Sequence, residues 1–159
     1  TAEVLEVGAT RLDAYCKKHA IDRVDFLKID AEGYDFDALE SFDFEALRPR
    51  LVMVEFGTMF ALHTPDAIDA ALAKMAARGY AALVLRYTDH GNFARGVFHH
   101  DLVEVVADRR ASLSVERGDF GNIFFYPADD AVFLRAFIEL LAAARARTEC
   151  VASVVSAIP

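Results

Sequence analysis

Short, continuously apolar runs alternate in this chain with segments whose apolar residues recur at helical spacing. The strand-length runs lie at residues 25–29, 51–56, 80–87 and 122–126. Segments of helical spacing lie at residues 10–19, 34–47, 64–78 and 129–147. Continuously apolar strands separated by helices are typical of a mostly parallel sheet with helices on both faces. The sequence therefore predicts an α/β fold that ends in a long amphipathic helix.

Two of the expected helices carry start signals. Thr64 is an expected N-cap, Pro65 suits the first helical position, and Asp66 complements the positive end of the helix dipole. Gly79 is the expected stop of that helix. Thr10 is the expected cap of the first helix.

The length and composition limit the classes of protein that this chain can belong to. Its 159 residues are 55% hydrophobic, which excludes intrinsic disorder and favours one domain. We expect an α/β domain at residues 1–127, followed by a terminal helix and tail at residues 128–159. Seventeen basic and 25 acidic residues give a net charge of −8, which argues against nucleic acid as a partner.

The cellular compartment is predicted from the lack of a membrane span, the lack of a secretion signal and the spacing of the two cysteines. No stretch approaches the roughly 20 uninterrupted apolar residues of a membrane span, and no secretion signal begins the sequence. Cys16 and Cys150 lie far apart and form no C-x-x-C pair, which favours free thiols in a reducing compartment. A cytoplasmic protein without a membrane partner is expected. Because the first residue is Thr, we also expect a processed chain or a piece of a longer one.

A long polar connection separates the third and fourth apolar runs, from residue 88 to residue 121. Long connections in α/β proteins often act as lids or binding loops. Residues 101–108 in its middle are apolar enough for a strand or a short helix, and the pattern does not distinguish these. His90 is a candidate substrate-binding residue or general base on its position alone.

Acidic residues follow two neighbouring apolar runs at the point where each run ends. Asp30 and Glu32 come after the first run, and Glu55 lies at the end of the second. Ligands of α/β sheets bind at the carboxyl ends of the strands, so we expect these carboxylates to gather there. Such a group suits a general base, a metal site or a hydroxyl-binding pair. The alternative is that Asp30 or Glu32 caps the following helix.

The stretch F-L-K-I-D-A-E-G-Y-D at residues 26–35 resembles the signature of the FkbM family of S-adenosylmethionine-dependent methyltransferases. T-R-L-D-A-Y-C at residues 10–16 and V-E-F on the next run are also similar to that family. The likeness covers residues 5–87 and returns weakly at residues 121–127. It implies methyl transfer from S-adenosylmethionine to a hydroxyl of a small-molecule acceptor, often a sugar or a natural product.

The resemblance assigns roles to the acidic residues. It places Asp30 beside the transferring methyl group, where it orients the acceptor hydroxyl or takes its proton; Asp30 is also the one candidate contact to the cofactor. Glu32 shares this role or caps the helix, and Glu55 is a substrate-side carboxylate or a solvated strand end. Tyr34 is a substrate platform or a core residue. No metal site is predicted, because the histidines at positions 63, 90, 99 and 100 follow no zinc spacing and suit solvated surface positions.

One feature of the family is missing from the sequence. Gly8 is a lone glycine, whereas the family has a glycine-rich turn after its first strand, where the backbone approaches the cofactor. The resemblance places the expected strands in the second half of a doubly wound, Rossmann-like methyltransferase sheet. The first three strands would precede Thr1, and this chain alone is expected to bind S-adenosylmethionine weakly or not at all.

Two other functions remain open. The chain suits a non-catalytic α/β binding or assembly module, whose exposed strand edge pairs with another copy or another protein. It also suits a metal-dependent hydrolase that uses Asp30, Glu32, Glu55 and His90.

Overall fold

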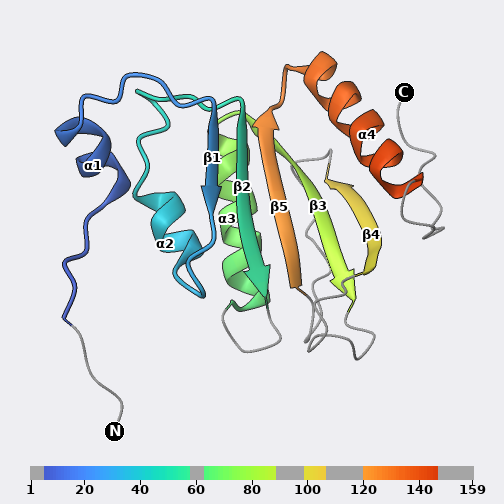
Figure 1. Cartoon of the computed structure of the whole chain (residues 1–159), viewed down its shortest axis with the longest axis horizontal. Coiled ribbons are helices and arrows are strands. Elements are labelled where there is room, and N and C mark those ends of the chain that lie inside the picture. The colour runs from blue at the N-terminus through green and yellow to red at the C-terminus, as the bar shows by residue number, and fades with distance from the viewer. Residues whose placement is uncertain (1–5, 58–62, 89–98, 107–119, 147–159) are drawn as a thin grey trace, which may run out of the picture.

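The computed structural model describes residues 6–57, 63–88, 99–106 and 120–146. Helices and strands alternate along most of the chain (Figure 1). In chain order they are α1 (Leu12–Lys18), β1 (Phe26–Ile29), α2 (Asp35–Glu40), β2 (Leu51–Gly57), α3 (Pro65–Ala77), β3 (Tyr80–Thr88), β4 (His99–Val106), β5 (Phe120–Pro127) and α4 (Ala131–Ala146).

The five strands form one sheet in the order β1-β2-β5-β3-β4. Among the strands that the structure describes, only β1 and β2 pair in parallel; the other three neighbouring pairs are antiparallel. The prediction of a mostly parallel sheet is therefore wrong. The sheet is mostly antiparallel because β5 runs antiparallel between β2 and β3, and β4 pairs antiparallel with the other edge of β3. Because β2 and β3 are both antiparallel to β5, they run in the same direction, and β1 runs with them.

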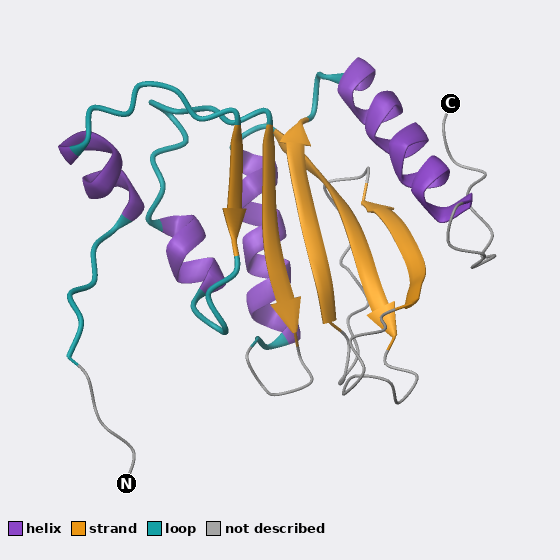
Figure 2. Cartoon of the chain, viewed as in Figure 1, coloured by secondary structure: helices purple, strands orange, loops and turns teal. Residues whose placement is uncertain are grey.

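Helices cover both faces of this sheet (Figure 2). Successive side chains of a strand point to opposite faces, so each central strand contributes to two cores. Val54 and Phe125 face the core formed with α1, α2 and α3, where Ile68 and Met75 of α3 are fully buried. The opposite core lies under α4 and contains buried side chains from β3 and β5: Leu83, Leu85, Phe124 and Tyr126. Burial on both faces explains why these strands are continuously apolar.

The predicted boundaries of α3 are confirmed. The Thr64 side chain accepts a hydrogen bond from the Ala67 N–H at 3.2 Å, and Pro65 is the first helical residue. The helix ends before Gly79, which has a φ of 82°, a conformation that glycine adopts without strain. The cap predicted at Thr10 is wrong, because Arg11 is the N-cap of α1 and makes no capping side-chain bond.

The second helix is shorter than its sequence pattern predicts. It ends at Glu40 rather than near residue 47, because Ser41 turns the chain and donates its hydroxyl to the Ala38 carbonyl at 2.7 Å. Phe42 and Phe44 then enter the core from this turn, with ring centroids 4.9 Å apart. Phe42 and Phe44 lie in a turn, and both side chains point into the core. Their spacing in the sequence therefore imitated that of a helix.

The polar connection contains β4, so the undecided segment at residues 101–108 is largely strand. His90 lies outside the described residues, as do residues 89–98 and 107–119. After β5, the Asp130 carboxylate accepts the Phe133 N–H at 2.8 Å and pairs with Arg50 at 3.0 Å, beside the start of α4. Within the described ranges, no helix has both the length and the apolar character needed to cross a membrane.

Candidate functional site

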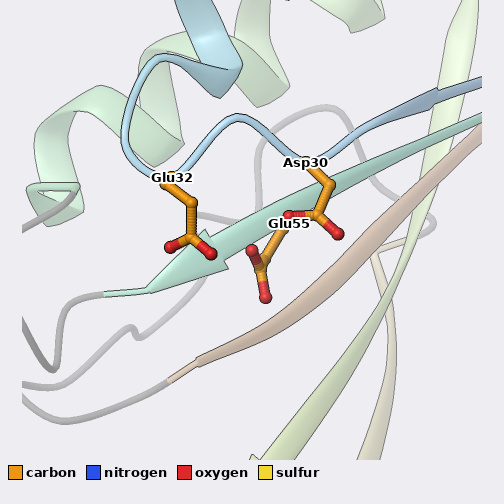
Figure 3. A group of neighbouring side chains, drawn as sticks. All are labelled: Asp30, Glu32 and Glu55. Carbon is orange, nitrogen blue, oxygen red and sulfur yellow. The ribbon is translucent and has the colours of Figure 1, made fainter.

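The candidate site is the group formed by Asp30, Glu32 and Glu55, referred to here as the acidic cluster. The parallel register of β1 and β2 pairs Ile29 with Val54, which places Asp30 beside Glu55 at the carboxyl ends of both strands. One carboxylate oxygen from each of the three residues lies within 4.8 Å of the others. Figure 3 shows the side chains converging from the end of β1, the following loop and β2. The predicted gathering of these residues is confirmed.

A strained turn presents Glu32 to the cluster. Its φ is 48°, and that of Gly33 is 103°, so two successive residues are left-handed. This conformation costs a non-glycine residue roughly 1–2 kcal/mol. The buried Asp35 carboxylate stabilises the turn, because it accepts the N–H of Ala31 at 2.8 Å and that of Gly33 at 3.0 Å.

The alternative that Asp30 or Glu32 caps the following helix is wrong. Tyr34 occupies the N-cap position of α2 and no side-chain capping bond is made there. Asp35 instead binds the free N–H groups of the preceding turn. The common turn pattern joins an aspartate to an N–H two residues later. Asp35 instead binds N–H groups two and four residues earlier, so the sequence pattern did not indicate this role.

Asp30 and Glu55 are chemically alike, but their surroundings move their pKa values in opposite directions. The Lys28 ammonium lies 2.6 Å from Asp30 Oδ2 and lowers the pKa of Asp30, as does a hydrogen bond with Glu55. Burial, followed by the negative charge of Asp30, raises the pKa of Glu55 to about 7. Two carboxylates this close titrate as a pair and share one proton. Near neutral pH the shared proton therefore favours Glu55, and Asp30 is the member that its surroundings keep ionised.

This arrangement supports two kinds of chemistry. An ionised Asp30 accepts a hydrogen bond from a ligand hydroxyl and is able to take its proton, and Glu55 is able to donate or to accept depending on pH. Three carboxylates at this spacing also suit a hard cation by ligand type. One Asp30 oxygen is already paired with Lys28, so part of the negative charge is balanced within the protein.

A buried histidine contacts Asp35 and the end of β2, and the sequence did not reveal its role. His63, expected at the surface, is 6% exposed and packs against Phe36 with ring centroids 4.5 Å apart. Its Nδ1 accepts the Gly57 N–H at 3.1 Å, and its Nε2 lies 3.4 Å from Asp35 Oδ2. Burial lowers the pKa of His63, so the ring is neutral at pH 7.

Of the two other predicted site residues, Tyr34 is described by the structure and His90 is not. Tyr34 is 73% exposed, so it is not a core residue, and the open side chain stays available as a substrate platform. His90 lies outside the described residues. Its proposed role in substrate binding stays a prediction.

The fold and the acidic strand ends define an α/β protein with its candidate site where parallel strands terminate. The family model for the methyltransferase FkbM domain matches residues 1–81. The chain therefore belongs to the FkbM methyltransferase family, and methyl transfer is its role at the level of the family. The match runs from the amino terminus through α3 to the start of β3 and includes the whole acidic cluster. Searches of curated proteins and of solved structures found no match.

The glycines at positions 8 and 79 do not supply the turn that would hold the nucleoside cofactor implied by the family. Such a turn needs a backbone that approaches the ligand closely, which glycine permits. Gly8 has no atom within 4 Å of the position that a Cβ would take, and Gly79 ends α3, beyond which β3 begins.

Proposed function

We propose that this chain carries the acceptor-binding half of an S-adenosylmethionine-dependent O-methyltransferase. S-adenosylmethionine, bound by a complete site, supplies the methyl group. The residues of this chain bind the acceptor, orient its hydroxyl and remove its proton. The observation that carries the proposal is the Asp30–Glu55 pair, which places an ionised carboxylate beside a nearly neutral one where two parallel strands end.

Asp30 is the proposed base. Its side chain is 41% exposed, so an acceptor hydroxyl is able to reach it from solvent. The hydroxyl donates to an Asp30 oxygen, which orients it and accepts its proton. The hydrogen bond with Glu55 lowers the pKa of Asp30 and so keeps that carboxylate ionised until the acceptor binds. Alignment of the hydroxyl contributes further to the rate, because methyl transfer is an in-line displacement.

The charge of the site favours an uncharged acceptor with several hydroxyl groups. Three carboxylates and one lysine leave the cluster negative, so a phosphorylated acceptor would be repelled. Neighbouring hydroxyls are able to donate to Asp30 and to Glu32 at the same time, because these carboxylates lie within 4.8 Å. A sugar or a hydroxylated natural product meets both conditions, and exposed Tyr34 offers a ring face to it.

The test is D30N in the enzyme completed with its cofactor-binding half. Methyl transfer to a panel of methyl glycosides should fall about 10²- to 10⁴-fold, the contribution of a positioned base. The melting temperature should change little, since an exposed ion pair such as Lys28–Asp30 contributes about 1 kcal/mol or less. D25N is the matched control, because Asp25 pairs with Arg23 in the same two-residue spacing at the opposite end of β1. Intact transfer in D30N would contradict the role of Asp30.

A metal-dependent hydrolase is the second candidate, and the spacing of the three carboxylates favours it. Calorimetry on this chain with Mg²⁺ and Mn²⁺ separates the two functions. Micromolar binding that is lost in E55Q would support the hydrolase. We expect no such binding, and weak or no binding of S-adenosylmethionine by this chain alone.

A further inference from the structure

Asp35 and His63 form a buried polar contact that the proposed chemistry does not use. Their side chains are 1% and 4% exposed. Transfer of an ionisable side chain from water into the interior is costly unless its polar atoms are satisfied. Nevertheless, among the described residues His63 Nε2 has no hydrogen-bond partner that meets normal geometry, and its distance of 3.4 Å from Asp35 Oδ2 is long.

Each member of this pair holds one of the two strand ends that carry the acidic cluster. Asp35 accepts both N–H groups that flank Glu32, those of Ala31 and Gly33. His63 closes a two-bond ring with Gly57: Nδ1 accepts the Gly57 N–H, and the His63 N–H donates to the Gly57 carbonyl at 2.9 Å. Gly57 lies two residues beyond Glu55 at the end of β2.

The protonation of His63 follows from these contacts. Because Nδ1 accepts a hydrogen bond, the proton of the neutral ring is on Nε2 and faces the Asp35 carboxylate. The contact therefore joins the turn after β1 to the end of β2, because the Nε2–H dipole of His63 points at the Asp35 carboxylate. The Phe36 ring, packed on the imidazole, limits its rotation.

We propose that the Asp35–His63 pair is a positioning element that fixes the spacing between Glu55 on β2 and the carboxylates of Asp30 and Glu32 on the β1 side. The inference rests on the proposed function in treating this cluster as the acceptor site. His63 touches neither the acceptor nor the reacting atoms; it acts through Asp35 and Gly57. Without the pair, the turn that carries Glu32 and the end of β2 lose their buried polar link.

The experiment measures the titration of Glu55, whose pKa is raised by burial first and then by its charged neighbours. Asp30, Glu32 and Asp35 raise the pKa of Glu55, and the Lys28 ammonium interacts with both Asp30 and Glu55. Carbon-13 NMR of the side-chain carboxyl groups in the full chain follows Glu55 without substrate or cofactor. Replacement of a neutral histidine by a neutral residue adds no charge, so a change in the Glu55 midpoint reports altered burial of Glu55 or altered distances to its charged neighbours.

In the wild type we expect a Glu55 midpoint near pH 7. H63L removes both contacts, and the midpoint should fall by at least about half a unit, a threefold loss of proton affinity. H63N keeps an acceptor for Gly57 but does not reach Asp35, so its midpoint should fall too. H63Q reaches Asp35 and should restore the wild-type value. If H63L does not fold, the H63N and H63Q pair decides the question.

Y80F is the control for general loss of stability. The Tyr80 hydroxyl donates to the Pro49 carbonyl at 2.9 Å, a buried hydrogen bond at the opposite end of the sheet. Y80F should lower the melting temperature without moving the Glu55 midpoint. An unchanged midpoint in folded H63L, or in H63N, would overturn the positioning role, as would an ordinary Glu55 midpoint in the wild type. Failure of methyl transfer would leave these titrations unaffected, so it would count against the proposed function alone.

Discussion

Asp30 and Glu55 show how one functional group acquires two properties from its surroundings. Asp30 follows β1 at an exposed position beside an ammonium group, and Glu55 sits across from it on a more buried strand. The protein therefore keeps one acid ionised and one nearly neutral within hydrogen-bonding reach. Separation of this kind assigns acid and base roles in many active sites.

The raised pKa of Glu55 makes a prediction about stability. The pKa rises from 4.5 to about 7 on folding, so the native state binds more protons than the unfolded state between these values. The stability that protonated Glu55 contributes is complete below pH 4.5 and is lost as the pH rises through 7. E55Q, which mimics the protonated acid, should therefore gain stability relative to the wild type as the pH rises from 5 to 8, by about 1–2 kcal/mol after discounting for solvent.

Urea unfolding at several pH values measures this difference. E45Q is the control, because Glu45 is exposed and lies outside the acidic cluster. Its difference from the wild type should not change across that interval. A constant difference for E55Q as well would mean that Glu55 titrates as an ordinary exposed carboxyl group.

Among the elements, α3 makes the sharpest prediction. Thr64 caps it with a hydrogen bond to the Ala67 N–H, and loss of such a cap costs about 1 kcal/mol. T64A should lower the free energy of unfolding by this amount in urea denaturation. T10A is the matched control, since Thr10 makes only a 3.5 Å contact to the Arg11 carbonyl and caps no helix. Equal losses in both variants would contradict the capping role of Thr64.

The elements also show which features the sequence was able to predict. The limits of α3 followed from Thr64, Pro65 and Gly79, whose effects are local. The convergence of Asp30 and Glu55 followed from the pairing of two strands joined by one helix. The place of β5 between β2 and β3 was missed, because apolar content does not specify strand order or direction. The Asp35–His63 contact was missed because it joins distant residues through tertiary packing.

The edge of the sheet leads to a prediction for the whole molecule. Within the described residues, β1 pairs only with β2, and Phe26 on β1 is 52% exposed. An uncovered strand edge with an exposed aromatic residue favours association, so we propose that the chain forms dimers through β1. Sedimentation velocity should show a concentration-dependent dimer, and F26K should weaken it about tenfold, or roughly 1.4 kcal/mol.

V132K is the control for this association. Val132 is 81% exposed and lies on α4, which packs on strands β3 and β5 rather than on β1. The variant should dimerise as the wild type does. A chain that sediments as a monomer at every concentration would contradict pairing through β1, and so would equal weakening by both variants.

The position of β5 has a consequence for how the molecule acquires its fold during synthesis. The strand that joins β2 to β3 is the last of the sheet to leave the ribosome. Until then, the backbone edges of both partners remain without their neighbour, and the pairing that completes the sheet spans much of the sequence. Such non-local pairing slows folding and prolongs the lifetime of aggregation-prone intermediates. We therefore expect the nascent polypeptide to expose the edges of β2 and β3 for longer than a chain with locally paired strands.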